Sequence, residues 1–189
     1  AEKTGAACDS YNRASLAAQR ILQIWRSSTG RSDSSLAAAA TGPEAPDRIR
    51  AALLSSEALE YPVLRDRFDQ FLDESFTIIP AVADALTRRD LSSVGPLIDR
   101  SQFAAERLLK NQVPETIALA RLARELGAAA ASAFGAGFGG SVWALVPAHE
   151  AEEFATRWSD RYRLSYPVSS GKASFFITRP GPPAIRFSQ

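Results

Sequence analysis

The segment AFGAGFGGSVWALV, residues 133–146, is the feature that most limits how this chain folds. Four of the chain's 11 glycines lie between residues 135 and 140, and an apolar run follows directly. Glycine permits a positive φ and leaves amide N–H groups uncovered, which is how many proteins form concave sites for anions. The segment therefore predicts a tight loop that another group approaches closely, and a phosphate is the first hypothesis.

This loop also satisfies the pattern G-x-G-x-x-G, through Gly135, Gly137 and Gly140. The pattern marks a dinucleotide-binding fold only where it follows a strand and opens a helix. Residues 141–146 are apolar and partly β-branched, which predicts a buried strand after the loop. The segment before the loop has helical character, so we expect the order helix, glycine loop, strand. That order excludes the dinucleotide-binding interpretation.

The rest of the chain is mainly helical by its apolar spacing and its turn residues. Ser, Gly and Pro dominate residues 27–46, which predicts a loop. We expect an α+β fold, a helical bundle packed on a small, mostly antiparallel sheet, in one domain over residues 1–189. The predicted helices cover 2–26, 47–59, a segment from Pro62 that Pro80 bends or interrupts, a segment capped by Asp90, 114–126 and 148–162, and the predicted strands cover 141–146, 173–180 and 184–187.

Composition narrows the classes of function. The formal net charge is +1 with scattered arginines, so we expect no nucleic-acid partner. No apolar stretch is long enough to cross a bilayer, and the N-terminus does not resemble a signal peptide. One cysteine, Cys8, fits a reducing compartment, and one histidine, His149, leaves no set of nitrogen and sulfur ligands for zinc. We expect a cytoplasmic protein without a membrane partner.

A family resemblance rests on the glycine segment. Residues 127–146 resemble the third signature of the galactokinase branch of the GHMP kinases, a loop of the form G-[AG]-G-F-G-G-[CS] that runs into a strand. Weaker similarities follow in the family's order, at residues 9–22, 67–74, 94–102 and 175–187. The seven places of the loop are filled by Gly135, Ala136, Gly137, Phe138, Gly139, Gly140 and Ser141.

Departures from the family pattern indicate a divergent subgroup. Gln70 and Gln102 stand where the family usually has histidine, and Ala14 stands where it has an arginine. The resemblance therefore does not identify the sugar. The serine-rich segment 33–40 imitates part of the family's phosphate loop, but it lacks the preceding P-x-G-x-G and we interpret it as a flexible loop.

The family's sugar clamp, phosphate loop and catalytic aspartate all lie in the N-terminal half of its members, and this chain has none of them. The chain also contains no methionine, even at position 1. We therefore expect that residues 1–189 are the C-terminal half of a longer protein, whose N-terminal half is absent from this sequence, and that this half alone has no kinase activity.

The resemblance implies an ATP-dependent sugar kinase that transfers the γ-phosphate of ATP to an anomeric hydroxyl. It implies that residues 135–141 lie near the ATP phosphates, and that the N-terminal half supplies the catalytic groups and the Mg ligands. It also matches Tyr11 to a tyrosine at the edge of the sugar pocket. From the residues themselves, the glycines could equally serve tight packing between loops, and Tyr11 could simply be a half-buried tyrosine.

Two other classes of function remain open at this point. One is a non-catalytic regulator or sensor of the same family, which would bind sugar and nucleotide without turnover. The other is an unrelated helical interaction domain whose glycine loop contacts a partner. A self-sufficient domain of that second kind would be compact and monodisperse alone, and the coding sequence upstream of Ala1 would distinguish an enzyme from both.

Overall fold

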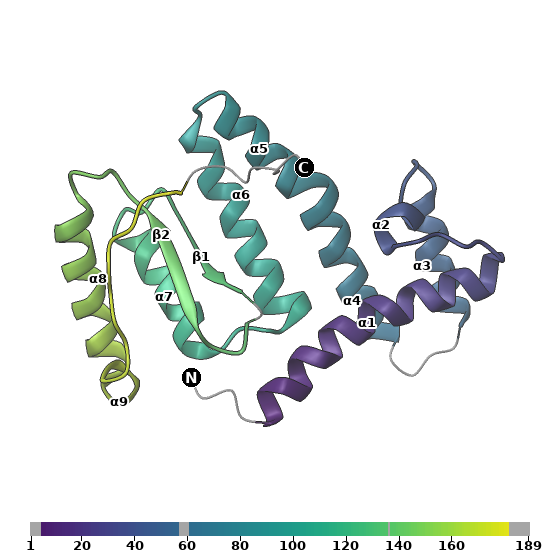
Figure 1. Ribbon diagram of the computed structural model, residues 1–189, viewed down its shortest axis with the longest axis horizontal. Helices are drawn as coiled ribbons and strands as arrows, with labels where there is room; N and C mark the ends of the chain where they lie inside the picture. The colour runs from purple at the N-terminus through teal and green to yellow at the C-terminus, as the bar shows by residue number, and fades with distance from the viewer. Residues whose placement is uncertain (1–4, 57–60, 136, 182–189) are drawn as a thin grey trace, which may run out of the picture.

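The computed structural model describes residues 5–56, 61–135 and 137–181, with the backbone alone at 5–11, 13 and 14. Helices dominate, and a two-stranded sheet lies among the C-terminal ones (Figure 1). The elements are α1 (Gly5–Thr29), α2 (Leu36–Ala39), α3 (Ala45–Ser55), α4 (Tyr61–Leu72), the π-helix η1 (Asp73–Ile78), α5 (Ile79–Thr87), α6 (Leu91–Ala104), the π-helix η2 (Ala105–Leu109), α7 (Pro114–Glu125), β1 (Ala130–Phe134), β2 (Ser141–Leu145), α8 (Ala151–Ser165) and α9 (Pro167–Ser170).

The predicted α+β fold is confirmed, with a small antiparallel sheet enclosed by helices. β1 and β2 pair in the register Ala130↔Leu145 to Phe134↔Ser141. Because strand side chains alternate between faces, Ala130 and its neighbour Ala131 enter two different cores. Ala130 packs with Val94 of α6, and Ala131 packs with α7 and α8. The hairpin is thus held between α6 on one face and α7 on the other.

A separate core joins the first four helices. Trp25 and Ile21 of α1 are fully buried against Phe68 of α4, with Ile49 of α3 and Leu36 of α2 beside them. Burying side chains of this size stabilises the fold by roughly 1.5–3 kcal/mol each. This cluster occupies the end of the molecule opposite to β1, β2 and α8 (Figure 1).

The order of elements around the glycine loop was predicted wrongly. The structure has strand, loop, strand, because β1 intervenes between α7 and the loop. The alanine-rich sequence of β1 has good helical propensity, but its pairing with β2 determines its conformation. The dinucleotide-binding interpretation remains excluded, since a strand and not a helix follows the loop.

The predicted strand 173–180 is not part of the observed sheet. Within the described part of the chain, residues 173–180 are extended without a ladder partner. Phe175 packs edge-on against Trp158 of α8 instead, with ring centroids 5.2 Å apart. The predicted strand 184–187 lies outside the described residues.

The helix predictions largely hold, with two refinements. Within 27–46, residues predicted as a loop, the structure has α2 and the start of α3. The expected interruption at Pro80 is confirmed: η1 ends two residues before it, and Ile79 donates its N–H five residues back to Glu74. Gly127 follows α7 with a φ of +101°, as a C-terminal glycine does.

Asp90 caps α6, as predicted. Its carboxylate accepts hydrogen bonds from the backbone N–H of Ser93 (3.2 Å) and from the hydroxyls of Ser92 and Ser93. These bonds favour the ionised carboxylate and lower the pKa of Asp90 to about 2. A cap of this kind satisfies an N–H that the helix itself cannot pair.

The folded-state pKa of Asp90 lies below its unfolded value, so the stabilisation is present above pH 4 and is lost as the pH falls towards 2. We predict that Asp90→Ala lowers the melting temperature at pH 7. We also predict that its difference from wild type shrinks between pH 4 and pH 2. Thermal unfolding over this range tests the prediction, with Asp160→Ala on the exposed face of α8 as the matched control. A pH-independent difference would contradict it.

Candidate functional site

The glycine loop joins β1 to β2 through a run of left-handed residues. The φ angles are +85° at Gly135, +84° at Gly137, +59° at Phe138, +100° at Gly139 and +111° at Gly140. Glycine adopts such angles without steric cost, whereas a side-chain-bearing residue such as Phe138 rarely does. The glycines of this segment are therefore required by the backbone conformation.

One side of the loop packs tightly against residue 111. Phe138 donates its backbone N–H to the carbonyl oxygen of Asn111 at 2.5 Å. A Cβ placed on Gly137 would overlap with the same oxygen and with the Asn111 side chain. Asn111 is buried, and it follows η2 after Lys110, whose φ of +53° turns the chain towards the loop. The loop is thus seated on the C-terminal end of η2.

The other side of the loop is open. No described atom lies within 4 Å of a Cβ built on Gly135 or Gly140. Ser141 is exposed at the start of β2, as is Phe134, with 68% of its surface accessible, at the end of β1. A left-handed glycine run with an uncovered side can present backbone N–H groups to an anion.

The two glutamines that depart from the family pattern are both buried, and Gln102 connects different elements. The Gln102 side-chain oxygen accepts hydrogen bonds from the backbone N–H of Ala133 (2.8 Å) and the hydroxyl of Ser132 (3.0 Å). Its amide donates to Glu106 on η2 at 2.9 Å. Gln102 therefore fixes the end of β1 immediately before the glycine loop.

Gln70 bonds within its own helix, α4. Its side-chain oxygen accepts a hydrogen bond of 2.6 Å from the guanidinium of Arg67. Arg67 is half-buried, and burial lowers the pKa of its guanidinium from the usual value. Among the described residues, its Nε is the buried side-chain nitrogen without a hydrogen-bond partner.

Sequence reasoning missed Asn111 and the structural part of Gln102. A signal for Gln102 was present, because it occupies a position where the family has histidine, another side chain able to bond the backbone. No local signal identified Asn111, since its role depends on the close approach of a loop 26 residues further along the chain.

Tyr11, the predicted sugar contact, belongs to α1. Its side chain lies outside the described residues, as does Ala136 of the glycine loop. The assignment of Tyr11 to the sugar pocket therefore stays a prediction.

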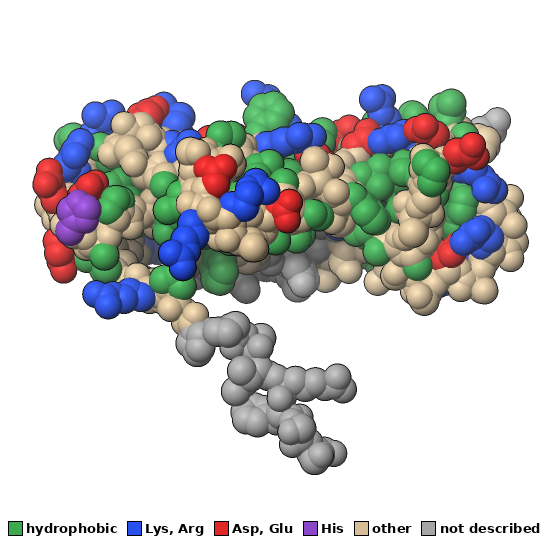
Figure 2. Space-filling view, turned by 90° about the horizontal axis from the view of Figure 1, so that it is seen from above, with side chains coloured by type: hydrophobic (Ala, Val, Ile, Leu, Met, Phe, Trp, Pro, Cys, Tyr) green, Lys and Arg blue, Asp and Glu red, His purple; other side chains and the backbone are tan. Residues whose placement is uncertain are grey.

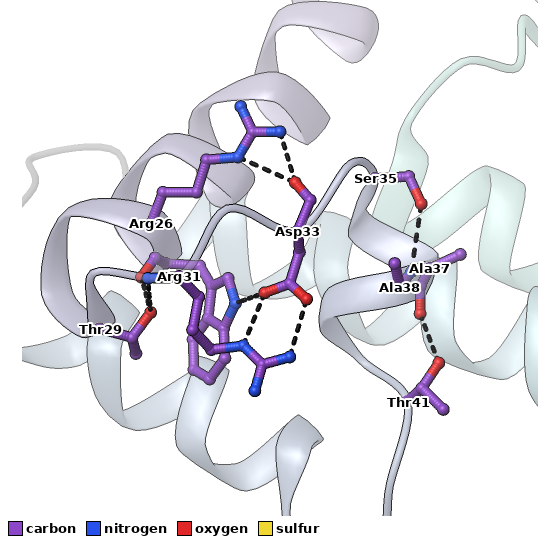
Figure 3. Close-up of polar contacts among 9 residues, drawn as sticks. Arg26, Thr29, Arg31, Asp33, Ser35, Ala37, Ala38 and Thr41 are labelled. Carbon is purple, nitrogen blue, oxygen red and sulfur yellow. Dashed lines mark hydrogen bonds and ion pairs between the residues drawn. The ribbon is translucent and has the colours of Figure 1, made fainter.

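The serine-rich segment 33–40 is ordered rather than a plain loop. The Asp33 carboxylate accepts bonds of 2.8 Å from both Arg31 and the indole N–H of Trp25, and Ser35 caps α2 (Figure 3). Thr41 closes the other end by donating its hydroxyl to the carbonyl of Ala37. These side chains hold the segment in place, which agrees with a role in the fold and not with a phosphate loop.

The comparisons with known proteins point to one family. Residues 82–164 match the family model described as GHMP kinases C terminal. The chain is similar to a galactokinase of Pyrococcus furiosus, with 29% identity over 119 residues, which is 63% of this chain. Residues 82–164 therefore resemble the C-terminal region of the GHMP kinases, and the chain is similar to a galactokinase. The match spans about a third of the length of that galactokinase, since it covers 33% of it.

The segment that matches the family model runs from within α5 to the last turn of α8 and includes the whole glycine loop. Charges are interspersed on the molecule: in Figure 2, basic and acidic side chains lie side by side along the visible face. Within the described ranges, no helix has both the length and the apolar character that crossing a membrane requires.

Gly135 and Gly137 form a matched pair for testing the loop, since their φ angles are nearly equal and only Gly137 faces Asn111. We predict that Gly135→Ala destabilises this chain by about 1–2 kcal/mol, the cost of a left-handed alanine. Gly137→Ala should cost about 1–3 kcal/mol more, because the added methyl must displace the Asn111 backbone. Denaturant unfolding of both variants measures the difference. Equal destabilisation would show that Gly137 is not packed as described.

Proposed function

We propose that this chain is the C-terminal half of an ATP-dependent, galactokinase-like sugar kinase. In this proposal, the full-length protein transfers the γ-phosphate of ATP to the anomeric hydroxyl of a sugar. The single observation that carries it is the glycine loop, which fills every place of the family's third signature and keeps one side open. The similarity to a galactokinase supports the substrate class.

The loop's part in the reaction is positioning. Phosphoryl transfer depends on holding the reacting groups in line and on neutralising the charge that develops on the phosphate oxygens. The open glycines, Gly135 and Gly140, let the ATP phosphates approach the backbone, where uncovered N–H groups favour negative charge. The packed glycine, Gly137, fixes the loop on Asn111 so that it does not have to reorganise when ATP binds.

The remaining catalytic groups are assigned to the N-terminal half. Mg²⁺ accompanies ATP and shields its charge, and within the described ranges no group of three or more His, Cys, Asp or Glu side chains could hold a metal ion. We therefore propose that the Mg ligands and the base lie in the N-terminal half, as does most of the sugar pocket. The open side of the loop would then face that half across the bound ATP.

Exposed aromatic side chains support a partner surface beside the loop. Phe134 ends β1 and Trp143 lies in the middle of β2, and both are on the sheet face that α6 covers only in part. Phe134 is 68% exposed and Trp143 is 36% exposed, which is unusual for aromatic side chains of a packed sheet. We propose that the N-terminal half covers them, so that the nucleotide binds where the two halves meet.

The assay that tests this proposal uses variants of the two open-side glycines in the full-length protein. We predict that Gly140→Ala and Gly135→Ala, which add a methyl group on the open side, lower kcat/KM for ATP by about tenfold or more. The melting temperatures of these variants should fall only by the amount expected for an alanine with a left-handed backbone conformation. These 189 residues alone should show no turnover. Full turnover by the open-side variants would remove the loop from the active site.

The same assay separates the enzyme from a regulator. A non-catalytic sensor of the family would bind sugar and ATP and show no sugar phosphate product. Turnover with a panel of sugars also identifies the substrate, which neither the sequence nor the 29% identity does. From its single cysteine we propose a cytoplasmic enzyme. From the net charge of +1 with scattered arginines and the lack of a long apolar stretch, we propose that it has no nucleic-acid or membrane partner.

Tyr11 offers a second, independent test of the sugar pocket. If its hydroxyl bonds the sugar, Tyr11→Phe removes one neutral hydrogen bond of about 0.5–1.5 kcal/mol. We predict a KM or kcat/KM for the sugar that worsens by a few-fold to about tenfold, with the ATP constant unchanged. A tyrosine that serves only the core would instead lower the melting temperature and leave both constants alone.

A further inference from the structure

A small pocket lies at the end of the molecule formed by α1, α2 and α3, far from the glycine loop (Figure 1). Its volume is about 210 Å³, which is smaller than pockets for whole drug-sized ligands. The functional side chains on its wall are Trp25, Arg31, Thr41, Glu44 and Arg48. The family model matches residues 82–164, which do not include the residues of this pocket.

Two guanidinium groups meet at one indole ring in this pocket. The guanidinium carbon of Arg31 lies 5.9 Å from the centroid of the Trp25 ring, and that of Arg48 lies 5.6 Å from it. Trp25 itself is only 1% exposed, so the ring position is fixed by the core beneath it. An aromatic face attracts cations, which holds both arginines over the same small area.

Asp33 neutralises only one of these two cations. Its carboxylate takes both bonds of the Arg31 fork, at 2.8 Å each, and a third bond from the Trp25 indole. Arg26 further fixes this turn by donating to the backbone carbonyl of Asp33 (Figure 3). The positive charge of Arg31 is thus matched and its orientation is set.

The guanidinium N–H groups of Arg48 remain available for a ligand. None of the ion pairs within the described residues involves Arg48. The carboxylate nearest in sequence, Glu44, lies one helical turn earlier on the pocket wall and is exposed. A guanidinium carries a planar fork of N–H groups that fits the two oxygens of a carboxylate or phosphate.

We propose that this pocket binds a small anionic group, a phosphate or a carboxylate, on the guanidinium of Arg48 over the Trp25 ring. The volume accommodates the anionic group and leaves the rest of a larger molecule outside. Arg31 stays paired with Asp33, so the unmatched positive charge belongs to Arg48, and Glu44 competes with the ligand for it.

An NMR titration of the 189-residue chain tests the proposal. Sodium phosphate and sodium acetate are added separately at constant ionic strength, and the assigned Trp25 indole N–H and Arg48 Nε–H signals are followed. We predict saturable shifts of both signals with at least one of the two anions. Tighter binding of phosphate would indicate a phosphorylated ligand, and tighter binding of acetate a carboxylate.

Variants connect the shifts to the pocket. Arg48→Gln should weaken binding by about tenfold, because it removes charge-assisted hydrogen bonds. Arg48→Lys should lie between Arg48→Gln and wild type, and Glu44→Gln should bind more tightly than wild type. Arg157→Gln, an exposed arginine of α8, is the matched control and should behave as wild type. The absence of saturation with both anions would overturn the proposal, and so would equal weakening by Arg48→Gln and Arg157→Gln.

If Arg48→Gln lowers the melting temperature, Arg48→Lys and Glu44→Gln still decide the question. Tighter binding by Glu44→Gln cannot result from unfolding, so it would support the pocket directly. Unchanged binding by both variants would overturn it.

Discussion

The arrangement of the C-terminal elements depends on the guanidinium of Arg124. At the end of α7, Arg124 forms a two-pronged ion pair with Asp99 of α6, with bonds of 2.9 and 3.0 Å. The same group donates to the carbonyl oxygens of Ala128 and Ala129, which lead into β1. One side chain therefore fixes two helices and the first strand relative to one another, and it pairs carbonyl groups that no regular element satisfies.

Gly95 allows this junction to close. A Cβ on Gly95 would overlap with the Ala129 carbonyl oxygen and lie close to the Arg124 guanidinium. Glycine inside a helix costs about 1 kcal/mol relative to alanine, so its presence in α6 indicates a packing requirement. The close contact brings α6 against β1, and this in turn places Gln102 and the end of η2 beneath the glycine loop. The loop conformation is thus a consequence of contacts made far from it.

The features that could be predicted from the sequence are those that single residues determine through their own hydrogen bonds or backbone conformation. Asp90, Pro114 and Gly127 mark helix ends through their own hydrogen-bonding or backbone properties, and the structure confirms each of them. The strand after the glycine loop was also predicted from its apolar, partly β-branched residues. Its predicted burial was wrong, because Ser141 and Trp143 of β2 are exposed and the other residues are only partly buried. The glycine loop itself followed from the residues that its left-handed angles require.

The features that were not predicted from the sequence depend on contacts between segments that are far apart in the chain. The sequence AASAF becomes β1 because β2 pairs with it, and Phe175 of segment 173–180 packs against α8 rather than in a ladder. Asn111 supplies a backbone carbonyl, which every residue has, so no residue type could have revealed it. The candidate site was therefore predictable as a loop but not as a loop with one packed and one open side.

Because the glycine loop has one packed side and one open side, the glycines of the signature do not all have the same role. Packing between loops and approach by a ligand were alternatives for the whole segment when only the sequence was considered. The structure divides them among positions: Gly137 is closed by Asn111, whereas Gly135 and Gly140 have space where a Cβ would point. A conformationally demanding loop needs a fixed side in order to hold an open side in place. Residues 135–140 meet both requirements. Glycine at 137 leaves room for Asn111 on the packed side, and glycine at 135 and 140 leaves the other side open.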